Sequence, residues 1–256
     1  MSLELHQFSI TKYGIQMKGL IYQEIFRVFR IFNQTIISPI VSSFMFAGMI
    51  LLAMATEQSD EHIRFIMNGI IISSIIQNTF MNSSHSFIMS KVLGYIIDLL
   101  IPPLTNLQIM MGYIVPSVIR SLIIGFGVFL ITHLFIVDMM PNHLSYLVII
   151  AILSSILMSL FGIFASLLTD NFESNSMVGS YLVTPLSMLS GTFYSIKKLP
   201  LFLQEVNKFN PFFYMIDGFR KAAMYSSDAT IPIILLAFNF IMFTVVYCML
   251  GTHLRK

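Results

Sequence analysis

The residues most able to do chemistry in this chain are a few polar side chains set within long apolar stretches. Ser74, Asn78 and Asn82 recur every four residues, which puts them on one face of a helix. Several amides facing lipid would be costly, so this face either bonds neighbouring helices or lines a hydrated route. Arg120 also lies inside an apolar stretch, where a guanidinium costs ~2.5 kcal/mol or more unless it has a partner or water. Asp98 is the candidate partner, and the alternative is that Arg120 extends to the membrane surface.

Three further groups of small or hydroxyl-bearing residues follow helical spacing inside apolar stretches. They are Ser155, Ser159, Gly162 and Ser166; Ser180, Thr184, Ser187 and Gly191; and Ser38 with Ser42. Stripes of small residues usually allow two helices to pack closely in lipid, and we expect this for the first group.

Motifs for hydrolytic chemistry are missing from the sequence. There is no G-x-x-x-x-G-K-[ST] loop, so the chain has no evident way to bind and hydrolyse ATP itself. There is no H-E-x-x-H, and no nucleophile–base pair can be assembled from helical spacing. The single cysteine, Cys248, excludes an intramolecular disulfide and a cysteine-based metal site. We therefore expect no catalytic residues and no cofactor bound by this chain.

The composition indicates a protein that spans a membrane several times. Hydrophobic side chains make up 56% of the 256 residues and charged ones only 10%, with a mean hydropathy of +0.83. A soluble domain of this length could not bury so much apolar surface. A net charge of +2, without a basic run, gives no reason to expect a nucleic-acid partner.

Six apolar stretches have about the length that a membrane span needs. They are Asn33–Ala55, Ile63–Ser83, Ile109–Val137, Leu144–Leu168, Met177–Phe193 and Ile231–Gly251. Six spans put both termini on one side. Lys12, Lys18, Arg27 and Arg30 precede the first span and acidic residues follow it, which favours a cytoplasmic amino terminus. The fold class predicted is an all-α integral membrane protein with six transmembrane helices in residues 33–256.

Three segments are too polar or too interrupted to cross. Residues 1–32 fit a helix lying along the interface, or else a cytoplasmic extension of the first span. Residues 90–108 fit a short surface helix that Pro102 and Pro103 end, placed where a soluble partner could push on the next span. Residues 195–227 contain seven charged residues, and two prolines interrupt the segment as well. Pro200 and Pro211 each look like the start of a short helix. We expect this last segment to enter the outer leaflet and return.

Two blocks of the sequence resemble the membrane subunit of type-2 ATP-binding-cassette exporters. The first block is Gly94-Tyr95-Ile96-Ile97-Asp98-Leu99-Leu100, Pro103-Leu104-Thr105, Gly112-Tyr113, Arg120 and Gly125. The second is Gly191-Thr192-Phe193-Tyr194, Leu199-Pro200, Asn210-Pro211 and Asp217-Gly218-Phe219-Arg220. The family includes exporters of nodulation factors, polysaccharides and drugs.

The resemblance implies a permease subunit in the bacterial inner membrane that works with a second copy of itself and two cassette ATPase subunits. Both termini would be cytoplasmic, ATP and Mg²⁺ would bind only to the partner subunit, and an amphipathic substrate would move outward. It implies a cytoplasmic coupling helix that includes Lys91, Gly94, Asp98, Leu99, Leu100 and Pro103. It implies a conduit lined by Ser38, Ser42, Ser74, Asn78, Asn82, Ser180, Thr184 and Ser187. It also implies a re-entrant extracytoplasmic helical hairpin that includes Pro200, Pro211, Asp217 and Arg220.

Two other functions fit parts of the sequence. An ion-coupled or passive transporter would be equally apolar, but the halves show no obvious inverted repeat and the acidic residues lie in loops or surface elements. An intramembrane enzyme would need a nucleophile–base pair that the spacing does not supply.

Overall fold

The structure, a computed structural model, describes residues 19, 21–22, 24, 26–27, 30, 32–53, 59–94, 105–194, 196, 199–225 and 228–253. Within these residues every extended element is helical, which confirms the predicted all-α class. The elements are η1 (Asn33–Ile37), α2 (Ser38–Ala53), α3 (Asp60–Val92), α5 (Asn106–Phe135), α6 (Leu144–Leu168), α7 (Phe172–Val178), η2 (Gly179–Val183), α8 (Thr184–Leu189), α9 (Leu201–Lys208), α10 (Pro211–Met224) and α11 (Thr230–His253). η1 and η2 are π-helical, and each continues directly into the helix that follows it.

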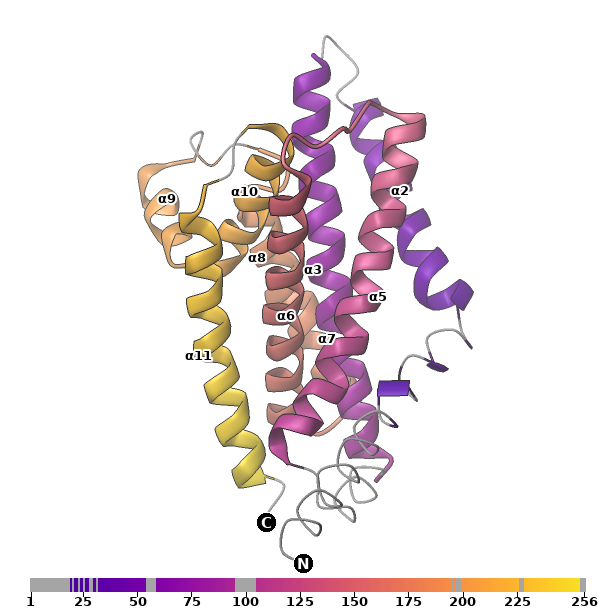
Figure 1. The fold of residues 1–256 in the computed structure, drawn as a ribbon, viewed down its shortest axis with the longest axis vertical. Coiled ribbons are helices and arrows are strands. Elements are labelled where there is room, and N and C mark those ends of the chain that lie inside the picture. Colours follow the sequence, from indigo (N-terminus) through magenta and orange to yellow (C-terminus); the bar gives the residue numbers. More distant parts are fainter. Residues whose placement is uncertain are drawn as a thin grey trace, which may run out of the picture.

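The long helices run side by side, and hydrogen bonds define the two ends of the bundle (Figure 1). At one end the loop before α6 bonds to the end of α10, with Asn142 N donating to the Ala223 carbonyl at 3.1 Å. We call this the hairpin end, because α9 and α10 lie there. At the opposite end the start of α5 lies beside the end of α11, with Asn106 Nδ2 3.5 Å from the Tyr247 carbonyl oxygen. We call this the C-terminal end.

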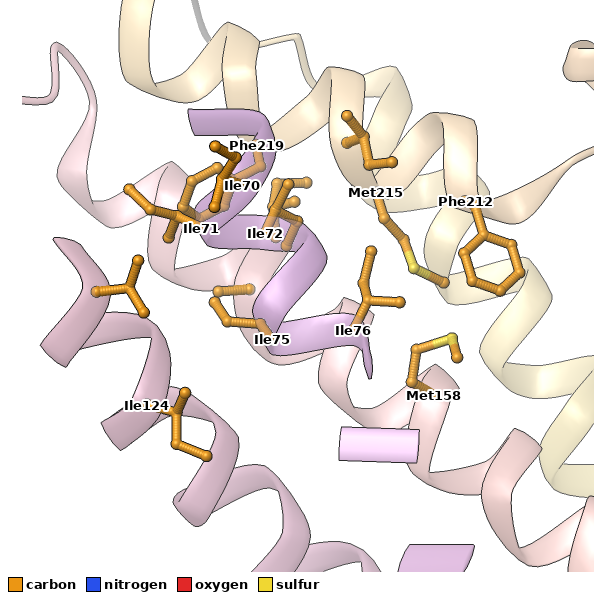
Figure 2. Close-up of a cluster of buried hydrophobic side chains, with 14 of the residues drawn as sticks. Ile70, Ile71, Ile72, Ile75, Ile76, Ile124, Met158, Phe212, Met215 and Phe219 are labelled. Carbon is orange, nitrogen blue, oxygen red and sulfur yellow. The ribbon is translucent and has the colours of Figure 1, made fainter. Parts of the chain in front are cut away.

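α3 forms the centre of the bundle and is enclosed by other helices along its middle. Ile66 and Ile76 are fully buried, as are the residues between them, on every face of the helix. Figure 2 shows the isoleucines of α3 pointing toward Ile124 of α5, Met158 of α6 and Phe219 of α10. An amphipathic surface helix would bury only one stripe, whereas other helices cover every face of this segment. Burial of α3 therefore comes from its central position.

α3 and α6 pack closely because α6 presents small residues to α3. A Cβ atom added at Gly162 would collide with Ser83 Oγ and lie 2.8 Å from the Phe80 carbonyl oxygen. Ser166 Oγ donates to the Ser84 carbonyl at 2.9 Å. The prediction that this serine and glycine stripe serves helix packing is confirmed.

Four helical segments of the described part of the chain are long and apolar enough to cross a membrane. They are Asn33–Leu52, Asn106–Phe135, Leu144–Leu168 and Thr230–Thr252. The other two predicted spans, Ile63–Ser83 and Met177–Phe193, fall on α3 and on α7–η2–α8 with the loop that follows. α3 is less apolar because amides and hydroxyls occupy its middle, and α7 begins with Phe172 and Glu173. Crossing by these two segments stays a prediction.

Two predicted boundaries are wrong. The surface segment 90–108 is shorter than expected, because α3 runs to Val92 and ends just before Gly94, whose φ of 78° suits a helix terminus. At its other side α5 begins at Asn106, since the Thr105 side chain accepts from Gln108 N at 3.3 Å and caps the helix. The fifth apolar stretch forms helix over 172–189, not 177–193.

Several predictions fall on residues outside the described ranges. These are residues 1–18 of the amino-terminal segment, Asp98, Leu99, Leu100 and Pro103 of the proposed coupling helix, and Lys197, Lys198 and Ser226 near the hairpin.

Candidate functional site

A pocket of about 440 Å³, lined by uncharged side chains, lies between α2, α3 and α8. It is lined by Ser38, Pro39, Ser42, Ser43, Phe46, Ile70, Ser73, Ser74, Gln77, Asn78, Met81, Ser187, Met188, Thr192 and Phe193. None of these residues carries a formal charge, and more than half carry a hydroxyl or an amide. Such side chains are unusual so deep in apolar helices, where each needs a hydrogen-bonding partner.

The structure places the eight candidate conduit residues in two groups. Ser38, Ser42, Ser74, Asn78 and Ser187 line the pocket. Asn82 is buried on α3 away from the lining, and its Nδ2 has no partner in the described residues. Ser180 is exposed, while Thr184 Oγ1 donates to the Gly179 carbonyl at 3.2 Å. A role in conduction stays a prediction for all eight.

Hydrogen bonds connect the pocket walls to each other. Gln77 Nε2 on α3 lies 3.5 Å from Ser187 Oγ on α8. Ser73 Oγ and Thr192 Oγ1 are 3.0 Å apart, which connects α3 to the loop after α8. The sequence analysis did not assign Ser73 or Thr192 to this site. Ser73 precedes Ser74, one position off the Ser74–Asn78–Asn82 face, and Thr192 belongs to a loop that periodicity does not place.

Two aromatic rings bound the pocket toward the hairpin end. Phe46 of α2 and Phe193 of the loop after α8 are 5.6 Å apart between ring centroids, at an interplanar angle of 68°. This edge-to-face arrangement is a favourable one for aromatic pairs. The lining therefore combines hydroxyl and amide groups with apolar surface from these rings, Ile70, Met81 and Met188.

Arg220 of α10 supports the loop that carries Thr192 and Phe193. Its side chain is buried, and burial lowers its pKa to about 10, so the guanidinium is charged at neutral pH. Nη2 donates to the Gly191 and Thr192 carbonyls, each at 3.0 Å. Nε donates to the Phe65 carbonyl of α3 at 3.2 Å, and the guanidinium carbon lies 3.6 Å from the centre of the Phe65 ring.

The other residues singled out in the hairpin act locally. Pro200 is the residue before α9, and Pro211 is the first residue of α10, where a missing N–H costs nothing. The prediction that each proline begins a short helix is confirmed. Asp217 Oδ2 pairs with Lys221 Nζ at 3.1 Å on the exposed side of α10.

Arg120 has a partner within the bundle. Its Nε and Nη2 lie 3.2 and 3.1 Å from the Thr35 carbonyl oxygen in η1. The guanidinium therefore bonds the backbone where the first apolar segment begins. This contact fits the alternative of a partner inside the bundle, while Asp98, the partner suggested by the sequence, lies outside the described residues.

Glu24 of the amino-terminal segment is buried against α3. Its side chain is only 5% exposed and accepts from Arg27 Nη2 at 2.7 Å and from Ser86 Oγ of α3 at 3.0 Å. Burial raises the pKa of the Glu24 carboxyl, which these two donors and Arg120 partly oppose. The contact with Ser86 joins this segment to α3, and the Glu24 side chain is buried between them.

Lys91, a predicted coupling residue, lies at the C-terminal end of the bundle. Its Nζ donates to the Thr169 carbonyl at 2.6 Å and pairs with Asp170 Oδ1 at 3.0 Å. Asp170 belongs to the short loop that joins α6 to α7. Lys91 therefore connects the end of α3 to the start of the segment that leads into α8.

The residues that line the pocket offer uncharged hydrogen-bonding groups beside apolar side chains. Within the described residues no three His, Cys, Asp or Glu side chains come together as metal ligands would. The pocket walls offer hydroxyl and amide groups with two aromatic rings, which suits non-covalent contact with an amphipathic molecule.

Comparison with known proteins decides the family. Residues 15–224 match the family described as ABC-2 type transporter. This chain belongs to that family. The inner membrane transport permease YadH of Escherichia coli strain K12 is 31% identical over 220 residues, which cover 84% of this chain and 86% of the relative. The protein of the same name from Shigella flexneri matches at the same identity and coverage. Both blocks of residues that resemble the family lie within the matched range.

Proposed function

We propose that the chain is the permease subunit of an ATP-binding-cassette exporter in the bacterial inner membrane. Two copies and two separate ATP-hydrolysing subunits would move an amphipathic substrate outward, such as a lipid-linked glycan, a lipid or a drug. The six apolar stretches would cross the membrane, with both termini in the cytoplasm and the α9–α10 hairpin at the outer leaflet. ATP and Mg²⁺ would bind to the partner subunit.

The uncharged polar pocket carries the proposal. It lies on helical segments that are apolar elsewhere, and lipid offers no reason for hydroxyls and amides from three segments to gather there. One chain supplies only one wall of a route across the membrane. A second copy related by a two-fold axis would supply the other wall.

Coupling to the ATPase would act at the C-terminal end of the bundle. The segment 95–104 joins α3 to α5, and Lys91 connects the end of α3 to the α6–α7 loop. A push on this segment would therefore reach α3 and the segment leading into α8, which are two of the three pocket walls. The match to relatives named as transport permeases supports an energy source outside this chain, since its own sequence has no phosphate-binding loop.

Co-purification tests the proposal. The tagged permease, expressed with a cassette ATPase from the same organism as its candidate partner, should retain that subunit through size-exclusion chromatography. Leu100→Glu should release the ATPase or uncouple its activity while the permease still inserts. Leu201→Glu is the matched control, because Leu201 is 80% exposed at the opposite end of the bundle. A permease that transports as a lone polypeptide would support an ion-coupled or passive transporter instead.

A further inference from the structure

The loop after α8 departs from helical structure inside the bundle. Gly191 has a φ of 89°, which ends the helix and turns the chain toward the hairpin. Carbonyl groups freed in this way need donors, because lipid supplies none. Within the described part of the chain Arg220 supplies them, and each of its acceptors is a backbone carbonyl: Phe65, Gly191 and Thr192.

The fit between this loop and α3 leaves little space for the loop to move. A Cβ atom at Gly69 would collide with the Thr192 carbonyl oxygen and lie 2.9 Å from Arg220 Nη2. Thr192 Oγ1 also donates to the Ser187 carbonyl at 2.7 Å and lies 3.0 Å from Ser73 Oγ. The backbone just before Phe193 is thus fixed to α3 on one side and to α8 on the other.

We propose that Arg220 is a positioning residue that closes the pocket toward the hairpin end. By holding the Gly191 and Thr192 carbonyls, it places Phe193 against Phe46 across the mouth of the pocket. The α9–α10 hairpin then controls the closure, because a movement of α10 relative to α3 would withdraw the donor. This inference rests on the proposed function, since a closure matters only if the pocket is part of a conduit.

A lysine could not replace Arg220 in this role. The guanidinium has five N–H donors in a rigid fork and reaches α3 and the loop at once, whereas an ammonium is a single point of charge. Lys221, the next residue, provides a natural comparison. It pairs with Asp217 and Asp228 at 3.1 and 3.5 Å and belongs to the exposed side of the same helix.

Thiol accessibility tests the inference without any transport assay. In a Cys248→Ser background, Ser74→Cys places a thiol in the pocket wall, and Ser59→Cys places one in the exposed loop before α3 at the hairpin end. A charged methanethiosulfonate reagent is added to intact cells and to inverted vesicles. The preparation in which Ser59→Cys reacts identifies the side of the membrane that the hairpin end faces. The labelling rate of Ser74→Cys is then measured from that side in each variant.

We expect slow labelling of Ser74→Cys with Arg220 intact and labelling about tenfold faster or more in Arg220→Met, because hydrogen bonds from a charged donor hold the closed state. Arg220→Lys should also label fast, and Lys221→Met should match the parent. Gly191→Ala should label fast too, because its Cβ would lie 3.0 Å from the Tyr194 carbonyl oxygen at a strained φ and displace the loop without removing the charge.

Equal Ser74→Cys labelling in the parent, Arg220→Met and Gly191→Ala would overturn the inference, as would fast labelling in the parent. If Arg220→Met fails to insert, labelling of Ser74→Cys in Gly191→Ala and Phe193→Ala tests the inference instead. Both variants disrupt the contact between Phe193 and Phe46 while Arg220 is retained. Labelling needs no ATPase, so loss of ATPase co-purification would refute the proposed function while leaving this result unchanged.

Discussion

Arg120 and Arg220 both have backbone carbonyls as hydrogen-bond partners. Arg120 bonds the Thr35 carbonyl at the start of η1–α2, and Arg220 bonds carbonyls of α3 and of the loop after α8. The Thr35 carbonyl lies in a π-helical turn and the Gly191 and Thr192 carbonyls lie in a loop, while the Phe65 carbonyl belongs to the regular helix α3. A cation with several donors satisfies carbonyls that a regular helix would have satisfied internally. These arginines therefore stabilise irregular backbone.

Arg120 should contribute measurably to stability. Arg120→Leu removes both donors from the Thr35 carbonyl, and hydrogen bonds from charged groups are worth roughly 1.5–3 kcal/mol. Arg120→Lys keeps one donor and should lose less. Thermal unfolding of the purified protein in detergent measures both. Lys208→Leu is the control, since its pair with Glu205 is largely exposed and should contribute under about 1 kcal/mol. Identical midpoints for the Leu and Lys variants would mean that the Thr35 contact is unimportant.

The sequence predicted helix starts correctly where they depend only on the residues of a single turn. Pro200 directly precedes α9 and Pro211 is the first residue of α10, two positions that proline suits whatever surrounds it. The burial of Glu24 was not predictable, because it depends on Ser86, which is far away in the sequence. Thr192 and Phe65 were missed for the same reason, since Arg220 brings them together across three elements.

At the scale of elements, the position of α3 explains why its sequence is mixed. It is enclosed by other helices over Ile66–Ile76, yet one face borders the pocket and carries Ser73, Ser74, Gln77 and Asn78. Hydropathy alone ranks this helix below its neighbours, although it is the most central of them. The order of the apolar stretches could be predicted from the sequence. Which of them forms the centre of the bundle could not, because that depends on which helix faces pack against each other.

The contact between α3 and α6 should be sensitive to one methyl group. Gly162→Ala forces a Cβ against Ser83 and Phe80 and should destabilise the protein by about 1–3 kcal/mol, as overpacking does. Gly48→Ala is the matched control, because nothing lies within 4 Å of a Cβ there. It should be neutral or slightly stabilising through helix propensity. Unfolding in detergent compares the two, and equal stability would show that α6 can move away from α3 at no cost.

At the scale of the whole molecule, the arrangement of the helices supports a topology with an even number of crossings. α11 ends at the C-terminal end of the bundle, where Glu24 of the amino-terminal segment contacts Ser86 near the end of α3, and the α9–α10 hairpin lies at the other end (Figure 1). A hairpin that enters the membrane and returns to the same side leaves the number of crossings even. Two prolines and several charges within it oppose a crossing helix.

Single cysteines test this topology. In a Cys248→Ser background, Lys197→Cys and Ser226→Cys flank the hairpin and should both react with a membrane-impermeant thiol reagent added outside intact cells. The reason is that a re-entrant segment returns to the side from which it entered. Reaction of either site only after the membrane is opened would mean that the hairpin crosses.

The central claim is that ATP on a separate subunit drives changes in the pocket between α2, α3 and α8. The most direct test follows Ser74→Cys in the complex of permease and ATPase, in a Cys248→Ser background, and compares its reaction rate with a methanethiosulfonate reagent under two conditions. One is free of nucleotide, and in the other the ATPase is trapped with ATP and vanadate. We predict that the rate differs severalfold between the two, and that Leu100→Glu abolishes the difference. A rate that is the same in both conditions, in a complex that hydrolyses ATP, would contradict the account.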